Sequence, residues 1–190
     1  PGVRHWRNWL PATYYCTHGL APVMYIADVM PAKVNAFVMS ADPKTDPRVR
    51  RTAAVRDVAA CLIVRMRDGS VAKALHGNLR GHGNWVRIHG AQGLMENMRW
   101  GHRDMLRVRR EPFEKKPDEP AECLYTPEFP LLAAEAQKAG HGGGDLFVLH
   151  HFAEAIRRNR QPYLNVHRAV AMALVGIQGW RSALDDSNAK

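Results

Sequence analysis

The chain has 190 residues, of which 46% are hydrophobic, and this length suits one domain with a substantial core rather than two. Its formal net charge is +9, from 27 Lys and Arg against 18 Asp and Glu, which favours anionic partners. The basic residues are scattered with no run of five or six, so we expect solvated faces and no nucleic-acid-binding surface.

The first half of the chain predicts a helix followed by strands. Apolar residues at helical spacing run from His18 to about Met30, and Pro31 ends the pattern. The segment 33–40 is typical of a strand, and 57–66 carries the strongest strand signal, with alternate apolar residues on one face. The Asp-Gly turn in "RDGS" predicts a hairpin whose second strand is "VAKALHG".

Short strands and a loop are predicted for the middle of the chain. The segments 84–90, 93–98 and 104–111 each fit a short strand. Residues 111–130 contain five prolines, so we interpret them as an extended surface loop.

The last third of the chain predicts helices. A short one lies within 130–140, and a second begins at Asp145, which is expected to be its N-cap. The expected core face of this second helix is Leu149, Phe152, Ala153 and Ile156. The final helix, over about 165–183, is expected to bury Val166, Val170, Ala173, Leu174, Ile177, Trp180 and Leu184.

This order of elements predicts an α+β fold: one domain over 1–190, with an open, mainly antiparallel sheet and helices packed on one face. The other face of the sheet is then available to a second copy of the chain. Strands and helices do not alternate as in βαβ units, and "GHGGGD" has no strand before it, so it is not interpreted as a dinucleotide-binding fingerprint.

Other sequence signals are weak. Cys16, Cys61 and Cys123 match no zinc spacing and indicate no disulfide scaffold, and the histidines show no metal-binding pattern. No stretch has 18 consecutive apolar residues, so no membrane span is predicted. The chain opens with "PGVRHWRNW", without methionine, which we interpret as a fragment of a longer protein; bacterial cytoplasm and export therefore both stay open.

Several motifs resemble one family along almost the whole chain. "DLFVLHHFAEAIRRNRQPYLNVHRAVAMALVGIQGWRSALDDS" and "VRIHGAQGLMEN" resemble the C-terminal domain of the Gfo/Idh/MocA oxidoreductases. "HWRNW", "YYCTHGLAP" and "AGHGGGD" resemble the narrower NAD-dependent α-N-acetylgalactosaminidase-like branch, whose motif reads Tyr-Pro-Thr-His-Gly-Leu-Gly-Pro. Cys16 and Ala21 depart from that motif. The polyol dehydrogenases of the family usually carry Asp where this chain has Tyr14, which makes that activity a weaker interpretation.

The resemblance implies roles for a few side chains. His18 and Tyr15 would transfer protons at the substrate, because an imidazole titrates near neutrality, and Arg7 and His141 would bind it. Tyr14 is expected to point into packing. Without the resemblance, His18 could be a polar cap, Tyr15 a half-buried aromatic and Arg7 a surface charge.

The resemblance also implies partners. The substrate would be a sugar or glycoside, and NAD or NADP would be bound by an N-terminal Rossmann domain that this chain does not include, so no cofactor is expected here. A homo-oligomer through the sheet is expected, with no nucleic-acid or membrane partner. The resemblance thus implies the substrate-side domain of a nicotinamide-dependent sugar-processing enzyme, either an oxidoreductase or a redox-assisted glycoside hydrolase acting on a sugar ring. The alternative is a basic oligomerisation or binding module without chemistry.

Overall fold

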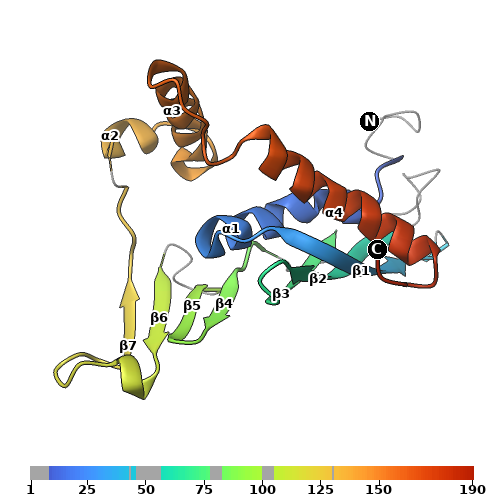
Figure 1. The fold of residues 1–190 in the computed structure, drawn as a ribbon, viewed down its shortest axis with the longest axis horizontal. Helices are drawn as coiled ribbons and strands as arrows, with labels where there is room; N and C mark the ends of the chain where they lie inside the picture. The colour runs from blue at the N-terminus through green and yellow to red at the C-terminus, as the bar shows by residue number, and fades with distance from the viewer. Residues whose placement is uncertain (1–8, 43, 46–56, 78–82, 100–104, 130) are drawn as a thin grey trace. The chain divides into compact units, whose positions relative to one another are not determined.

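The computed structural model describes residues 9–42, 44–45, 57–77, 83–99, 105–129 and 131–190, which fall into two compact units. The first unit combines residues 1–86 with 167–190, and the second comprises 87–166. Figure 1 shows the elements of both units along the chain.

The first unit contains a three-stranded antiparallel sheet with strand order β1-β2-β3. Its elements are η2 (Ala12–Cys16), α1 (Thr17–Ala27), β1 (Pro31–Ser40), β2 (Asp57–Met66), β3 (Val71–Gly77) and, except for its first residue, α4 (Val166–Leu184). The β2–β3 hairpin has the bounds that the sequence predicts. The Asp-Gly turn closes it, and Gly69 there has a positive φ of 90°.

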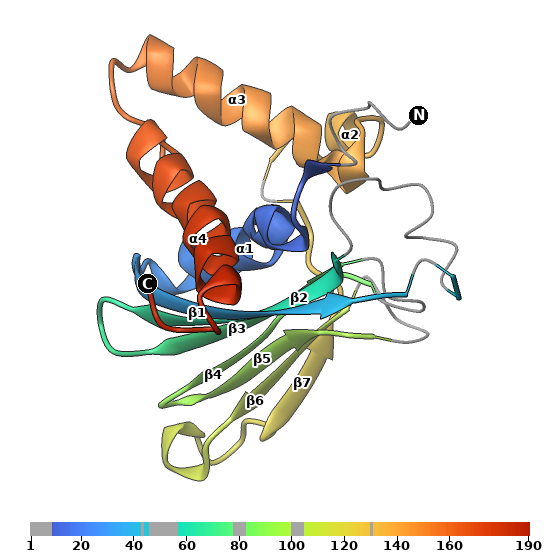
Figure 2. The ribbon, with the colours of Figure 1, turned by 90° about the vertical axis from the view of Figure 1, so that its right-hand side faces the viewer.

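One face of this sheet carries the core. On β2, Leu62 and Val64 are fully buried, while the intervening Ile63 is exposed, as the predicted alternation requires. Helices α1 and α4 lie on the same side of the sheet (Figure 2). They contribute Leu20, Met24, Met172 and Val175 to the core cluster.

Helix α4 packs through a face different from the one that the sequence predicts. Most of the predicted apolar face is exposed, including Val170 and Leu174. The buried face contains Gly176, Gly179 and Ser182, and the Ser182 hydroxyl accepts the backbone N–H of Ala36 on β1 at 3.1 Å. Gly179 faces the sheet, since a Cβ there would lie 2.9 Å from Cδ2 of Leu62, whereas Gly176 faces η2, since a Cβ there would lie 2.8 Å from the carbonyl oxygen of Thr13.

The second unit contains a four-stranded antiparallel sheet with strand order β4-β5-β6-β7. Its elements are β4 (Arg87–Gly90), β5 (Gly93–Asn97), β6 (Leu106–Arg110), η4 (Pro112–Glu114), β7 (Glu122–Tyr125), α2 (Ala133–Ala136), η5 (His141–Gly143) and α3 (Gly144–Arg157). The prediction of an extended loop over 111–130 is therefore wrong for β7 and η4. Prolines flank β7 without interrupting it, because Pro120 and Pro127 lie just outside its ends.

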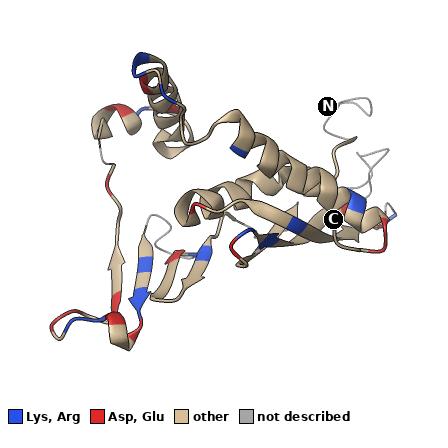
Figure 3. Cartoon of the chain, viewed as in Figure 1, with Lys and Arg blue, Asp and Glu red and all other residues tan. Residues whose placement is uncertain are grey.

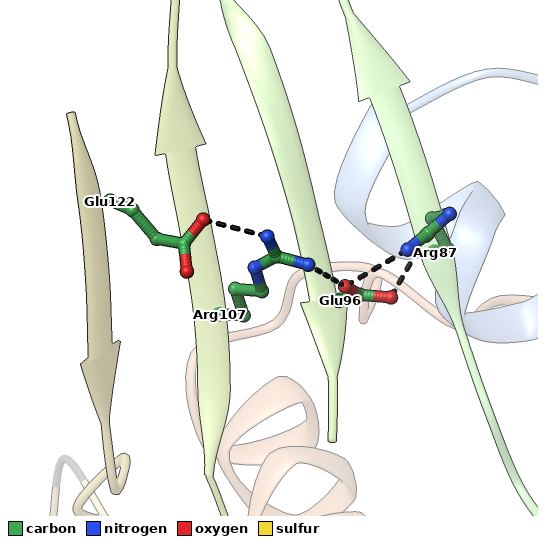
Figure 4. Close-up of polar contacts among 4 residues, drawn as sticks. All are labelled: Arg87, Glu96, Arg107 and Glu122. Carbon is green, nitrogen blue, oxygen red and sulfur yellow. Dashed lines mark hydrogen bonds and ion pairs between the residues drawn. The ribbon is translucent and has the colours of Figure 1, made fainter. Parts of the chain in front are cut away.

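A row of charged side chains crosses all four strands of this sheet (Figure 4). Glu96 on β5 accepts two hydrogen bonds from Arg87 on β4, at 2.8 and 3.1 Å, and one from Arg107 on β6 at 3.1 Å. Arg107 also donates to Glu122 on β7 at 2.7 Å, which lowers the pKa of that carboxyl. Figure 3 shows acidic and basic residues on these neighbouring strands.

We expect Glu96→Gln to weaken this sheet, because the Glu96 side chain is only 7% exposed and its charge serves both arginines. The expected loss is about 1–2 kcal/mol of local stability, less than for a fully buried pair because both arginines are partly solvated. Hydrogen exchange of the β5 and β6 amides measures it. Glu119→Gln, which breaks a more exposed pair with Arg110, is the control and should change protection by less than about 0.5 kcal/mol.

The α+β class and the antiparallel pairing are confirmed, but the described strands form two sheets rather than the single one expected.

Helix α3 lies beside η5 and α2, and its predicted core residues Leu149, Phe152 and Ile156 are 60–67% exposed, so the prediction that they form its core face is wrong. Among the described helices, none is long and apolar enough to cross a membrane.

Candidate functional site

The junction of η2 and α1 brings Tyr15 and His18 together. The 3-10 helix η2 runs directly into α1 at Thr17, so residues three apart fall on the same side of one helical path. The two ring centroids are 5.7 Å apart, with the planes tilted by 42°. Tyr15 is 39% exposed and His18 is also exposed, so both rings are accessible from solvent.

The backbone beneath these rings is held closely. A Cβ at Gly19 would lie 2.9 Å from Nε2 of His76, a residue of β3 that is 9% exposed. Pro22, inside α1, has no N–H for the carbonyl of His18 four residues earlier. His76 carries only a weak signal in the sequence, which is the inward position it shares with Ala72 and Ala74 on β3.

Tyr14 does not point into packing as expected. Its side chain is 38% exposed, about the same as that of Tyr15. The backbone of Tyr14, rather than its side chain, packs closely on α4. A Cβ at Gly176 of α4 would lie 3.1 Å from the Tyr14 Cα.

The start of η2 is anchored by Asp57, the first residue of β2. Its carboxylate accepts the backbone N–H of Ala12. Burial of this carboxyl raises its pKa, and the hydrogen bond from Ala12 opposes that effect without cancelling it. The charged form of Asp57 is therefore less favourable in the folded protein than in the unfolded chain.

The raised pKa of Asp57 and its hydrogen bond to Ala12 predict different changes in the free energy of unfolding for two substitutions of Asp57. Since its pKa is raised on folding, its contribution to the free energy of unfolding is greatest at acid pH and declines as the pH rises through the folded pKa. Asp57→Asn keeps an acceptor for Ala12 without a charge, so we expect stability at pH 7 at least equal to wild type. Asp57→Ala removes the acceptor and should cost about 1 kcal/mol. Urea unfolding at acid and neutral pH measures both, and a strongly destabilised Asn variant would contradict the argument.

Cys16 is unsuited to nucleophilic chemistry although it lies between the two tyrosines and His18. It is fully buried, and burial raises the pKa of its thiol to about 11. Its Sγ lies 3.7 Å from the carbonyl oxygen of Met172 on α4. At neutral pH it is an uncharged packing group. Cys61 and Cys123 are also free thiols.

His141 lies in the second unit, and its partner is Asp145, which was expected to be a helix N-cap. Its Nδ1 lies 2.8 Å from Oδ1 of Asp145, and the side chains are 86% and 55% exposed. The N-cap of α3 is Gly143, so the expectation that Asp145 is the N-cap is wrong. Arg7 lies outside the described residues, and the described residues contain no group of three or more His, Cys, Asp or Glu placed to hold a metal.

The fold, antiparallel sheets with helices covering one face of a sheet, is similar to about half of several solved oxidoreductases. Aldose-aldose oxidoreductase from Caulobacter crescentus, solved with glycerol, is similar with a TM-score of 0.71 and 14% identity, over 100% of this chain and 51% of that one. Levoglucosan dehydrogenase, solved with NADH and L-sorbose, is similar with a TM-score of 0.70 and 18% identity, over 96% and 52%. An NAD binding oxidoreductase from Klebsiella pneumoniae is similar with a TM-score of 0.69 and 13% identity, over 90% of this chain and 47% of that one.

A family model places the chain more narrowly. The model of the glycosyl hydrolase 109 C-terminal domain matches residues 4–189, and the chain belongs to this family. No curated protein matches it. The chain spans about half the length of the solved structures named above. The resemblance inferred from the sequence motifs is confirmed.

Proposed function

We propose that this chain is the substrate-side domain of a nicotinamide-dependent enzyme that processes sugars, and that the complete protein is a redox-assisted glycoside hydrolase. The observation that carries the proposal is the exposed Tyr15–His18 pair within a domain of the glycosyl hydrolase 109 family. Two of the similar solved proteins are named as enzymes of sugars, aldose-aldose oxidoreductase and levoglucosan dehydrogenase.

The residue types of the site favour proton transfer over direct hydrolysis by two carboxylates. The sequence 12–27, which forms η2 and α1, contains no Asp or Glu but places a phenol beside an imidazole. A bound nicotinamide would remove a hydride from a ring carbon of the sugar and later return it. While that carbon is a ketone, the neighbouring C–H is acidic, and Tyr15 or His18 can take its proton.

Loss of that proton allows the group at the anomeric carbon to leave by elimination, and a proton carrier at the site supplies the proton that the departing oxygen needs. Water would then add to the anomeric carbon, a proton carrier at the site would return the abstracted proton, and hydride from the nicotinamide would be needed to reduce the ketone. The net reaction is hydrolysis with no net oxidation. Tyr15 and His18 share the two proton transfers, while Arg7 and His141 are proposed to bind substrate hydroxyls.

The test uses the complete protein with an aryl glycoside in deuterated water. We expect deuterium on the carbon next to the anomeric centre of the product, because solvent exchanges with the removed proton before it is restored. Product without deuterium at that carbon would contradict the elimination route, and no turnover of any aryl glycoside would contradict the hydrolase proposal itself.

The cofactor is proposed to be NAD or NADP held by a separate N-terminal Rossmann domain. Dinucleotide sites lie at the carboxyl ends of parallel strands, next to a glycine turn and a helix N-terminus. The described strands of this chain pair antiparallel, which does not fit such a site. We therefore expect calorimetry to detect weak or no binding of NAD to the isolated chain, and micromolar affinity would contradict this division of roles.

We also propose that the protein forms a homo-oligomer through the sheet face of the first unit that lies opposite α1 and α4. Phe37, Ile63 and Leu75 on this face are 37–58% exposed, which supports an apolar contact. Light scattering of the complete protein tests it, and a monomer at all concentrations would contradict it.

Either the bacterial cytoplasm or export fits the activity, and an upstream Arg-Arg signal would decide for export.

A further inference from the structure

The loop before α3 holds His141 in an unusual backbone conformation. Three successive residues have positive φ: His141 at 53°, Gly142 at 62° and Gly143 at 94°. His is among the residues that adopt this region more readily, but it remains uncommon for any side chain other than glycine. Local strain of this kind persists where surrounding contacts determine the conformation.

Contacts around Gly143 hold the loop in this conformation. A Cβ at Gly143 would lie 2.7 Å from Cζ of Phe129 and 3.2 Å from Cβ of Ala136, and its φ of 94° strains any other residue, so glycine is favoured there. Phe129 in turn packs on Phe147 of α3, with ring centroids 5.2 Å apart. The Gly143 N–H donates to the carbonyl of Gly140 at 3.1 Å, which closes the turn. The loop is therefore a built structure that presents His141 at the surface.

Asp145 makes the specific contact with this histidine. It is the second residue of α3, and its carboxylate turns back toward the loop to reach Nδ1 of His141 at 2.8 Å. A carboxylate only accepts hydrogen bonds, so Nδ1 carries the proton. In the neutral imidazole, Nε2 then has a lone pair, and the 86% exposed side chain makes it available to an incoming hydroxyl.

We propose that Asp145 is a positioning residue: it fixes His141 in the Nδ1–H tautomer so that Nε2 accepts the proton of a substrate hydroxyl. The inference rests on the proposed function for its substrate class, a sugar hydroxyl. With side chains 86% and 55% exposed, the hydrogen bond between Asp145 and the neutral imidazole adds little to stability, so its expected effect is on the tautomer of His141. The arrangement matches the general use of a carboxylate to orient a working histidine.

The first test reads the tautomer and does not depend on activity. The complete protein is prepared with ring-15N histidine, and the His141 signals are assigned by their loss in His141→Gln. At about pH 8.5, where an imidazole is ordinarily neutral, we expect a protonated Nδ1 and an unprotonated Nε2. Asp145→Asn should increase the Nε2–H form, because the amide group can donate to Nδ1. An Nε2–H tautomer in the wild type, or no change in the variant, would overturn the proposal.

The second test is kinetic. Asp145→Asn should lower kcat/KM for an aryl glycoside about 10- to 100-fold, but by less than about twofold when His141 is already Gln. A loss of equal size in both backgrounds would indicate a structural role and overturn the proposal. Glu154→Gln, which alters another acidic residue of α3 paired with Arg157 and Arg158, is the matched control and should stay within about twofold of wild type.

The two tests separate this proposal from the proposed function. If the complete protein turns over no glycoside, the hydrolase assignment fails while the tautomer measurement still decides the role of Asp145. If the protein is active and Asp145→Asn is fully active, the positioning role fails and the hydrolase assignment stands.

Discussion

His18→Ala in the complete protein is expected to lower kcat/KM for an aryl glycoside by at least about tenfold, which corresponds to about 1.4 kcal/mol of transition-state stabilisation. General acid–base groups commonly contribute 10²–10⁴-fold, so tenfold is a lower bound. Tyr15→Phe should cause a loss of similar size, because it removes the phenol proton but keeps the ring beside His18. Steady-state kinetics and deuterium incorporation into the product measure both effects.

Tyr14→Phe is the matched control for these variants. Tyr14 is on the same 3-10 helix as Tyr15 and is exposed to the same degree, 38% against 39%. We expect Tyr14→Phe to keep kcat/KM within about twofold of wild type. Full activity of both His18→Ala and Tyr15→Phe would show that the pair is a surface contact without a role in proton transfer.

Gly176→Ala is expected to disturb the same site from a distance in the sequence. A Cβ at this position would lie 2.8 Å from the carbonyl oxygen of Thr13 and 3.3 Å from Sγ of Cys16. Backbone atoms of η2 cannot move aside as the end of a side chain can. Overpacking typically costs about 1–3 kcal/mol, whereas the gain in helix propensity from Gly to Ala is about 1 kcal/mol.

The net expectation for Gly176→Ala is a loss of up to about 2 kcal/mol in the free energy of unfolding, together with a lower kcat/KM, because η2 carries Tyr15. Urea unfolding and kinetics on the complete protein measure the two effects. Gly83→Ala is the control, since a Cβ there has no atom of the described residues within 4 Å and should change neither quantity. A more stable Gly176→Ala variant would show that α4 moves away from η2 at little cost.

Local patterns were sufficient for most elements of secondary structure. The alternation over 57–66 and the Asp-Gly turn predicted the β2–β3 hairpin with its correct bounds, because both signals depend on neighbouring residues alone. The motif "YYCTHGLAP" likewise led to Tyr15 and His18, whose spacing of three residues brings the rings together on any helical path. Strand β7 was missed because the prolines around it outweighed a strand of only four residues.

The pairings between distant residues depended on the tertiary structure. Apolar periodicity selected the large residues of α4, but the helix buries Gly176 and Gly179, because close approach to the chain beneath it requires small side chains. Periodicity measures hydrophobicity and carries no information about the distance to a neighbouring element. Equally, nothing local shows that His76 lies beneath Gly19, or that Asp57 holds the start of η2 from 45 residues away.

The family, the α+β class and the candidate pair of Tyr15 and His18 could thus be inferred from the sequence by itself, since each depends on short motifs and local periodicity. Only the tertiary structure decided which face of α4 is buried, and which partner Asp145 has. The sequence is equally compatible with Asp145 capping α3 or contacting His141, because both acceptor geometries are available to an Asp near a helix start. In the folded protein, His141, Gly142 and Gly143 all have positive φ, Gly143 packs closely on Phe129, and the His141 imidazole contacts the Asp145 carboxylate.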